Sequence, residues 1–176
     1  MITLLPLPVE AKEFTVREVT GADCAALDAL YADEEVRKYV GTSSAFTRRP
    51  GESPDAAFQR GHVDTMRPAA IAAPTGSVLG ALSLRRYDGN GAEPGDFEIT
   101  IALRKDVRGR RIGSDVRSAV LDALRGGLVV RRVIARVAAG HKPSLHLVQA
   151  LHFTKIGEQP NLHSGQLDGV FALDIN

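Results

Sequence analysis

The stretch from residue 97 to residue 125 constrains the fold of this chain more than any other. It begins with FEITIAL (97–103), in which apolar residues recur at every second position and predict a strand. Apolar residues then recur with helical period at positions 112, 116, 119, 120, 123 and 124, and Gly126-Gly127 end the pattern. A strand that leads through a short turn into an amphipathic helix predicts a sheet with helices packed on it.

Patterns along the rest of the chain predict further elements. We expect strands over 14–19, 68–73, 78–84, 128–137, 153–156 and 170–175, and helices over 20–30, 33–40 and 143–152, with another helix opening at 53–55 after a loop at 42–52. A length of 176 residues fits one domain. Because helices enter between strands late in the chain, we predict a single mixed α/β (α+β) domain over residues 1–176, with a mostly antiparallel central sheet and flanking helices.

Composition and charge argue against several function classes. Lys and Arg number 22 against 21 Asp and Glu, and the chain has no Trp, which does not favour a dedicated nucleic-acid surface. No run of about 20 apolar residues is present, so we expect no membrane span. The single cysteine, Cys24, excludes a disulfide framework and a cysteine-rich metal site, and it fits the cytoplasmic location that we expect.

The turn between the strand and the helix, residues 104–111, has the chemistry of a phosphate site. Five of its eight residues are basic. The first N–H groups of a helix lack internal partners and attract anions, and the small residues Gly109, Gly113 and Ser114 would let a phosphate approach the backbone. Two alternatives stay open: a solvated basic turn before an ordinary core helix, and a nucleic-acid contact, although the turn has no aromatic residues on which bases could stack.

This turn resembles motif A of the GNAT superfamily, the acyl-CoA-dependent N-acetyltransferases, whose pattern is Arg/Gln-x-x-Gly-x-Gly/Ala. Residues 108–113 (RGRRIG) match the pattern at Arg108 and Gly113 and carry Arg111 at the first glycine position. We expect Arg111 to adopt helical backbone angles, because the periodic helix pattern already begins at Ile112.

A second stretch, residues 133–153, resembles motif B of the same superfamily, in which Asn-x-x-Ser is followed by a Tyr and by Leu-Gly-Phe. Here the Asn position is His141, the Ser is Ser144 and the Tyr position is Val148, while Leu-His-Phe ends the stretch. Residues 33–39 also look like the second helix of the ribosomal-protein N-acetyltransferase-like branch. The resemblance implies a GNAT-like fold.

The resemblance also implies acetyl-CoA as the cofactor, without a metal. The pantetheine arm would lie along Ile101, Ala102 and Leu103, and His141 stands where the family's Asn touches that arm. The residues implied for the pyrophosphate are Arg108, Gly109, Arg110, Arg111, Ile112, Gly113 and Ser114.

Two residues are candidates for proton transfer. Glu98 lies on the strand face opposite to the apolar residues, where several family members place an acid, and we predict it as the base. The alternative is a plain solvent-facing carboxylate. Because Val148 cannot donate a proton, Ser144 is the predicted donor, the alternative being a simple helix-start serine. Arg136 stands where some N-terminal acetyltransferases keep an acid.

The function implied is direct transfer of an acetyl group from acetyl-CoA to a primary amine, on a small molecule or at a peptide N-terminus. The alternative is a catalytically degenerate GNAT-fold protein that binds acyl-CoA or a partner without turnover. Arg111, His141 and Val148 are the departures from the family pattern that keep this alternative open. Dimers are common in the superfamily, so a homodimer is also an expectation.

Overall fold

A computed structural model of the chain describes residues 5–40, 51, 66–127, 129–161 and 164–175. Within these ranges it contains an eight-stranded sheet in the order β1-β2-β3-β4-β5-β6-β8-β7. All neighbouring strands are antiparallel except β5 and β6, which run parallel. The strands are β1 (Val9–Glu10), β2 (Thr15–Glu18), β3 (Met66–Ala72), β4 (Val78–Arg86), β5 (Asp96–Leu103), β6 (Arg132–Ala138), β7 (Thr154–Pro160) and β8 (Leu167–Asp174).

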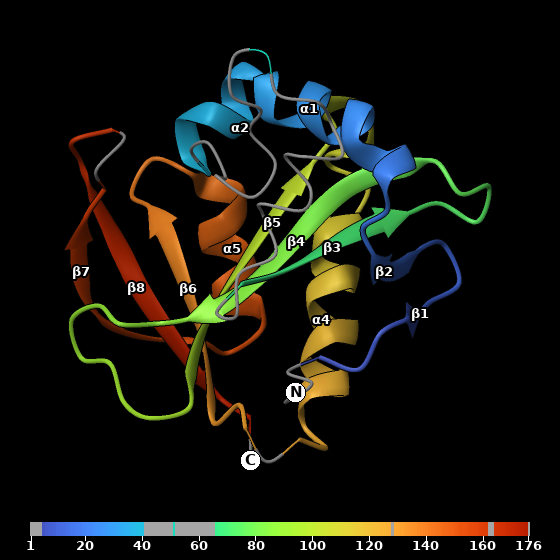
Figure 1. The fold of residues 1–176 in the computed structure, drawn as a ribbon. Helices are drawn as coiled ribbons and strands as arrows, with labels where there is room; N and C mark the ends of the chain where they lie inside the picture. Colours follow the sequence, from blue (N-terminus) through green and yellow to red (C-terminus); the bar gives the residue numbers. More distant parts are fainter. Residues whose placement is uncertain (1–4, 41–50, 52–65, 128, 162–163, 176) are drawn as a thin grey trace.

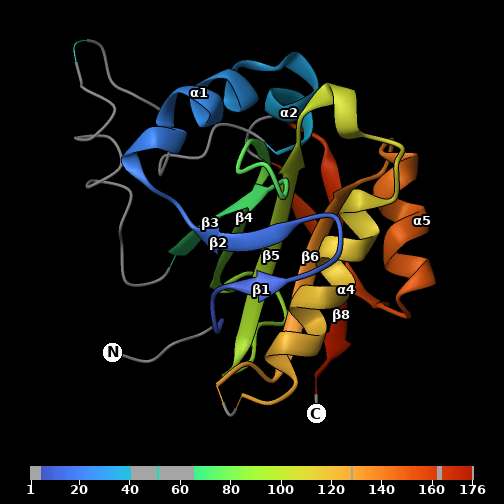
Figure 2. The same cartoon turned by 90° about the vertical axis from the view of Figure 1, so that its right-hand side faces the viewer.

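Helices cover both faces of this sheet (Figures 1 and 2). On one face, α1 (Cys24–Ala32) and α2 (Glu34–Tyr39) pack their apolar residues against small alanines of β3, β4 and β5. On the other face lie α4 (Ile112–Leu124) and α5 (Lys142–Ala150), and the buried stripe of α4 joins Phe97 and Ile99 in the larger core. The predicted fold class, a mixed and mostly antiparallel sheet with flanking helices, is confirmed.

The opening between β5 and β6 positions the site. These two strands pair only where Asp96–Glu98 meet Arg132–Ile134. β5 then continues to Leu103 and β6 to Ala138 without pairing with each other, and the two ribbons separate in Figure 1. Because β4 and β8 occupy their outer edges, the inner backbone N–H and C=O groups of both strands face the gap, where a ligand can bond to them.

A buried ion pair holds the closed end of this opening. Arg132 donates from Nε to Oδ1 of Asp96 at 2.8 Å and from Nη2 to Oδ2 at 2.5 Å, and the Glu93 N–H donates to Oδ2 at 2.8 Å. Burial acts to raise the pKa of Asp96, but the hydrogen bonds from Arg132 and Glu93 and the charge of Arg132 outweigh it and hold that pKa below its ordinary value. The pair joins the first residue of β5 to the first residue of β6.

Most elements agree with the sequence expectations, with local differences. β6 begins at Arg132 rather than at 128, because the N–H of Arg131 bonds to the Gly95 carbonyl before the ladder starts. The two-residue strand β1 is too short to show a period and was not expected. The helix expected at 53–55 lies outside the described residues, as does the loop at 42–52 apart from Gly51. None of the described helices has the length and apolarity to cross a bilayer, since α4, the longest of them, has 13 residues.

Candidate active site

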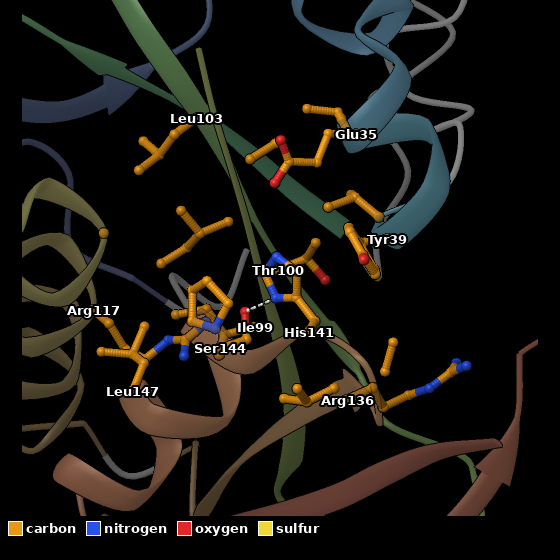
Figure 3. Close-up of a pocket in the computed structure, with 18 of the residues that line it drawn as sticks. Glu35, Tyr39, Ile99, Thr100, Leu103, Arg117, Arg136, His141, Ser144 and Leu147 are labelled. Carbon is orange, nitrogen blue, oxygen red and sulfur yellow. Dashed lines mark hydrogen bonds between the residues drawn. The ribbon is translucent and has the colours of Figure 1, made fainter. Parts of the chain in front are cut away.

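A cavity of about 640 Å³ lies at the opening between β5 and β6 (Figure 3). The predicted site residues that line it are Glu98, Ile101, Ala102, Leu103, Arg108, Gly109, Arg111, Gly113, Ser114, His141 and Ser144. Two others do not line it: the Arg110 side chain is exposed, and the Ile112 side chain is buried in the core. The fold therefore gathers into one cavity residues that the sequence places on a strand, a turn and two helices.

The residue before α4 departs from its expected conformation. Arg111 is the N-cap of the helix with φ 64° and ψ −5°, so the prediction of helical angles there is wrong. Between the 3-10 turn Lys105–Val107 and α4 the chain passes through two left-handed residues, Gly109 at φ 76° and Arg111, and these lead it into the helix. Such angles cost a residue with a Cβ about 1–2 kcal/mol. His152, at φ 60°, is the other non-glycine residue with positive φ in the described ranges, and both stand where the GNAT motifs have glycine.

Arg108 ties the phosphate turn to α2. Its Nη2 donates to Asp33 Oδ1 and its Nη1 to Glu35 Oε2, each at 2.8 Å, while Nε donates to the Leu103 carbonyl at 2.9 Å. Asp33 also accepts from the Val36 N–H at 3.0 Å and so caps α2. The hydrogen bond from Arg108 is the main cause that lowers the pKa of Asp33. The Arg108 guanidinium is thus engaged by the protein, and its contact with a cofactor stays a prediction.

Glu98 faces the α1–α2 side of the sheet. It is 6% exposed, so the alternative of a solvent-facing carboxylate is wrong. In the register of β4 and β5 it lies directly opposite Arg85, whose guanidinium contacts Oε2. Its neighbours Phe97 and Ile99 point to the other face, into the core under α4. The carboxylate therefore lines the cavity at the closed end of the opening, across the sheet from α4.

His141 and Ser144 form a hydrogen-bonded pair at the start of α5. Nδ1 of His141 lies 2.6 Å from Oγ of Ser144, and the Tyr39 ring of α2 lies 4.3 Å from the imidazole, centroid to centroid. Burial lowers the pKa of His141, the Glu35 carboxylate acts to raise it, and Arg108 adds to the lowering. The imidazole is therefore neutral at pH 7. Val148, one turn further along α5, is fully buried and offers no polar group.

The cavity also contains groups that the sequence reasoning did not assign to the site. Nη2 of Arg136 on β6 donates to Oδ2 of Asp168 on β8 at 3.1 Å. Nδ2 of Asn161, the residue after β7, lies 3.0 Å from the same oxygen. On α4, Arg117 lines the cavity and is 6% exposed. A signal for Arg117 was present, because it falls four residues after Gly113 and three before Val120, on the buried stripe of the helix.

Among the described residues that line the cavity, positive charge exceeds negative charge. Three of them are carboxylates (Glu35, Glu98 and Asp168) and five are arginines (Arg85, Arg108, Arg111, Arg117 and Arg136). The first N–H groups of α4 add to this field beside Gly113 and Ser114. No group of three or more His, Cys, Asp or Glu among the described residues is placed to hold a metal ion. The arrangement fits a long ligand that carries phosphates at one end and lies along a strand edge.

The chain is similar to a known family in sequence and to solved structures in fold. The sequence profile described as "Acetyltransferase (GNAT) domain" matches residues 13–154. No curated protein sequence matches the chain.

Three solved structures superpose over nearly the whole chain. A GNAT-family acetyltransferase from Bacillus anthracis does so with a TM-score of 0.75 and 14% identity, over 96% of this chain and 99% of that one. The ribosomal-protein-S5-alanine acetyltransferase of Vibrio fischeri has a TM-score of 0.76 and 13% identity, over 97% and 98%. The spermidine N-acetyltransferase of Vibrio cholerae, in complex with CoA and spermine, has a TM-score of 0.73 and 15% identity, over 92% and 95%. At such identities the superpositions establish a common fold.

Proposed function

The chain belongs to the GNAT family of acetyltransferases, and from this premise we propose how its cavity carries out acyl-CoA-dependent N-acetylation. Its acyl donor is acetyl-CoA and its acceptor is an amine. The observation that carries the proposal is that one cavity, at the β5–β6 opening, joins all the groups that the reaction needs. It extends from the start of α4 to Glu98 and to the His141–Ser144 pair.

Acetyl-CoA binds, in this proposal, with its pyrophosphate at the start of α4. Backbone N–H groups from Gly109 to Ser114 and the side chains of Arg110 and Arg111 bind the phosphates. Arg108 holds the same turn against α2. The pantetheine arm then follows Ile101–Leu103 and forms backbone hydrogen bonds with the inner edge of β5, which β6 leaves free. Three residues of extended strand cover roughly 10 Å, which brings the thioester from Leu103 toward the closed end of the opening.

The transfer forms a C–N bond and breaks the thioester C–S bond. The amine nitrogen attacks the thioester carbonyl, and Glu98 accepts a proton from that nitrogen directly or through a water molecule. The position of Glu98 supports this role, because its carboxylate lies at the closed end of the opening and is held by Arg85. The products are the acetylated amine and the thiolate of CoA.

Ser144 supplies the proton that the leaving thiolate takes up. Its hydroxyl lies 2.6 Å from Nδ1 of His141 and lines the cavity. The Oγ–H donates its proton to the sulfur, the Nδ1–H of His141 passes its proton to Oγ, and Nε2 of His141 takes up a proton from water, so the imidazole stays neutral; the transfer needs the tautomer protonated at Nδ1. The pair thus provides the proton that Val148 cannot provide from the position where family members have tyrosine.

The acceptor is a primary amine of a small molecule or of a peptide N-terminus. Charge pairing supports an acceptor with one amine over a polyamine. Among the described residues of the cavity, Glu98 is bonded to Arg85, Asp168 to Arg136, and Glu35 to Arg108. The described lining residues thus leave no spare carboxylate for a second ammonium group, and a polycation that bound to them would have to break one of these pairs.

The test measures CoA thiol release with acetyl-CoA and a panel of primary amines. Glu98→Gln should lower kcat by about 10²–10⁴-fold, and Ser144→Ala should lower it by a smaller factor. Glu158→Gln and Ser118→Ala are matched controls at exposed positions and should leave kcat unchanged. Each variant is checked for acetyl-CoA binding by its thermal shift, so that a lost site is not mistaken for lost chemistry.

Unchanged turnover in Glu98→Gln would remove its assignment as the base. Binding of acetyl-CoA without acetylation of any amine would favour the degenerate protein instead.

A further inference from the structure

Arg117 is a buried cation that has no counter-charge among the described residues. Arg117 is the sixth residue of α4 and lines the cavity, and 6% of the residue is exposed. Nε and Nη1 have no hydrogen-bond partner among the described residues. Burial lowers the pKa of Arg117 to about 10, and no carboxylate among the described residues acts to raise it. The guanidinium nevertheless stays charged at neutral pH.

An arrangement of this kind is costly to the free protein. A buried charge normally has an opposite charge and a full set of hydrogen bonds, and the guanidinium brings five N–H donors and no acceptor. Three other arginines of the cavity wall each contact a carboxylate: Arg85, Arg108 and Arg136. Within the part of the chain that the structure describes, Arg117 differs from them in contacting no carboxylate, so a ligand in the cavity can supply the partner of this cation.

The position of Arg117 favours the acyl end of the donor over the phosphate end. Figure 3 shows Arg117 on the side of the cavity that carries Ser144 and Leu147, across from Glu35 and Tyr39. Ser144 is the group that we place beside the sulfur, so Arg117 lies on the same wall as the thioester. The phosphate contacts are instead made by the exposed turn before α4, where Arg110 and Arg111 reach solvent.

We propose that Arg117 binds a carboxylate at the far end of the acyl group, so that the enzyme also uses acyl-CoA donors derived from dicarboxylic acids and prefers them to uncharged acyl groups of equal length. This inference rests on the proposed function. A planar guanidinium suits a carboxylate, and pairing in a buried site strengthens the contact. The chemistry is the same transfer: the amine attacks the thioester carbonyl, Glu98 takes the amine proton, and the CoA thiolate leaves with a proton from Ser144. The distal carboxylate stays unchanged in the product amide.

The experiment compares succinyl-CoA with butyryl-CoA, which have acyl chains of the same length and differ by the terminal carboxylate. Binding to the full chain is measured by calorimetry, with free CoA as a third ligand. We expect the wild-type Kd for succinyl-CoA to be lower than that for butyryl-CoA by roughly tenfold or more. Arg117→Met keeps an unbranched, apolar stem and removes the guanidinium with its charge, and it should abolish or reverse this preference and leave the Kd of free CoA unchanged. Arg125→Met is the matched control, because Arg125 ends the same helix on an exposed surface.

Three results would overturn the inference. The first is equal wild-type affinity for succinyl-CoA and butyryl-CoA, which decides the question even if Arg117→Met does not fold. The second is an equal loss of affinity for free CoA and both acyl-CoAs in Arg117→Met, which would assign Arg117 to the pantetheine arm. The third is an unchanged preference in Arg117→Met. Failure of the proposed function is distinguishable, because it appears either as no binding of free CoA to the wild-type protein or as no acetylation of any amine in the thiol-release assay, and neither result depends on the comparison of the two acyl-CoAs.

Discussion

Replacing Asp96 with Asn should destabilise the protein far more than the loss of one surface charge. Asp96 is 1% exposed and accepts hydrogen bonds from two Arg132 nitrogens and from the Glu93 N–H. Asparagine has nearly the same shape but carries no charge and cannot accept from both Arg132 nitrogens. The substitution leaves the Arg132 guanidinium without its buried counter-ion at the point where β5 and β6 meet.

The expected loss is about 2–4 kcal/mol in the free energy of unfolding. Breaking a fully buried ion pair by removing one partner costs about 3–5 kcal/mol. Here the cost is somewhat lower, because the Arg132 side chain is 15% exposed and Glu93 lies 3.3 Å away as a second carboxylate. With a urea m-value of about 2 kcal/mol/M, the unfolding midpoint should fall by roughly 1–2 M.

The effect should also depend on pH in a defined direction. The pKa of Asp96 is lower in the folded protein than in the unfolded chain, where an Asp side chain has a pKa of about 3.9. The stabilisation is therefore complete above that unfolded value and is lost as the pH falls through the folded pKa. The difference between wild type and Asp96→Asn should shrink in acid.

Urea titration at pH 7 measures the change, with Asp122→Asn as the matched control. Asp122 forms an ion pair with Arg125, but their side chains are 64% and 54% exposed, so its loss should cost at most about 1 kcal/mol. If Asp96→Asn were no more destabilising than Asp122→Asn, the argument that this pair holds the closed end of the opening would fail.

Three further predictions concern backbone strain, helix capping and pH. In urea titration, Arg111→Gly should be about 1 kcal/mol more stable than Arg111→Ala, because glycine is unstrained at φ 64° and alanine is not. The same two substitutions at His152 should differ in the same direction. Equal stabilities of the glycine and alanine variants would contradict the strain. Asp33→Ala should cost about 1–2 kcal/mol, because it removes both the cap of α2 and a partner of Arg108, whereas Glu34→Ala at the exposed neighbouring position should cost less. Stability should rise with pH between the lowered pKa of folded His141 and its unfolded value near 6.5, because the unfolded chain takes up the proton first, and His141→Gln should lose that rise.

Much of the local structure and part of the site were within reach of the sequence. The alternating pattern of β5 predicted which face Glu98 occupies, and the apolar stripe of α4 predicted that the helix begins at Ile112. Both signals are local, because strand and helix periods are set by the backbone geometry of a few neighbouring residues. The residues predicted for the cofactor therefore converge on one cavity, with the exception of the Arg110 and Ile112 side chains.

The backbone of Arg111 was predicted incorrectly for a reason that is also local. The pattern placed the start of the helix correctly, but it did not show that the preceding residue is left-handed. Periodicity reports which face a side chain occupies and carries no information on the backbone angles of a residue outside the helix.

By itself, the sequence determined the strand, the basic turn and the helix that form the cofactor side of the cavity. Only the tertiary structure decided what each charged side chain meets. Arg108 bonds to residues 73 and 75 positions away, and Arg85 meets Glu98 across a strand pair. That Arg117 meets no carboxylate among the described residues depends on the segments that pack around it in the fold. Electrostatic partners depend on which distant segments fold together and on the exclusion of water between them, and no local period encodes either of these.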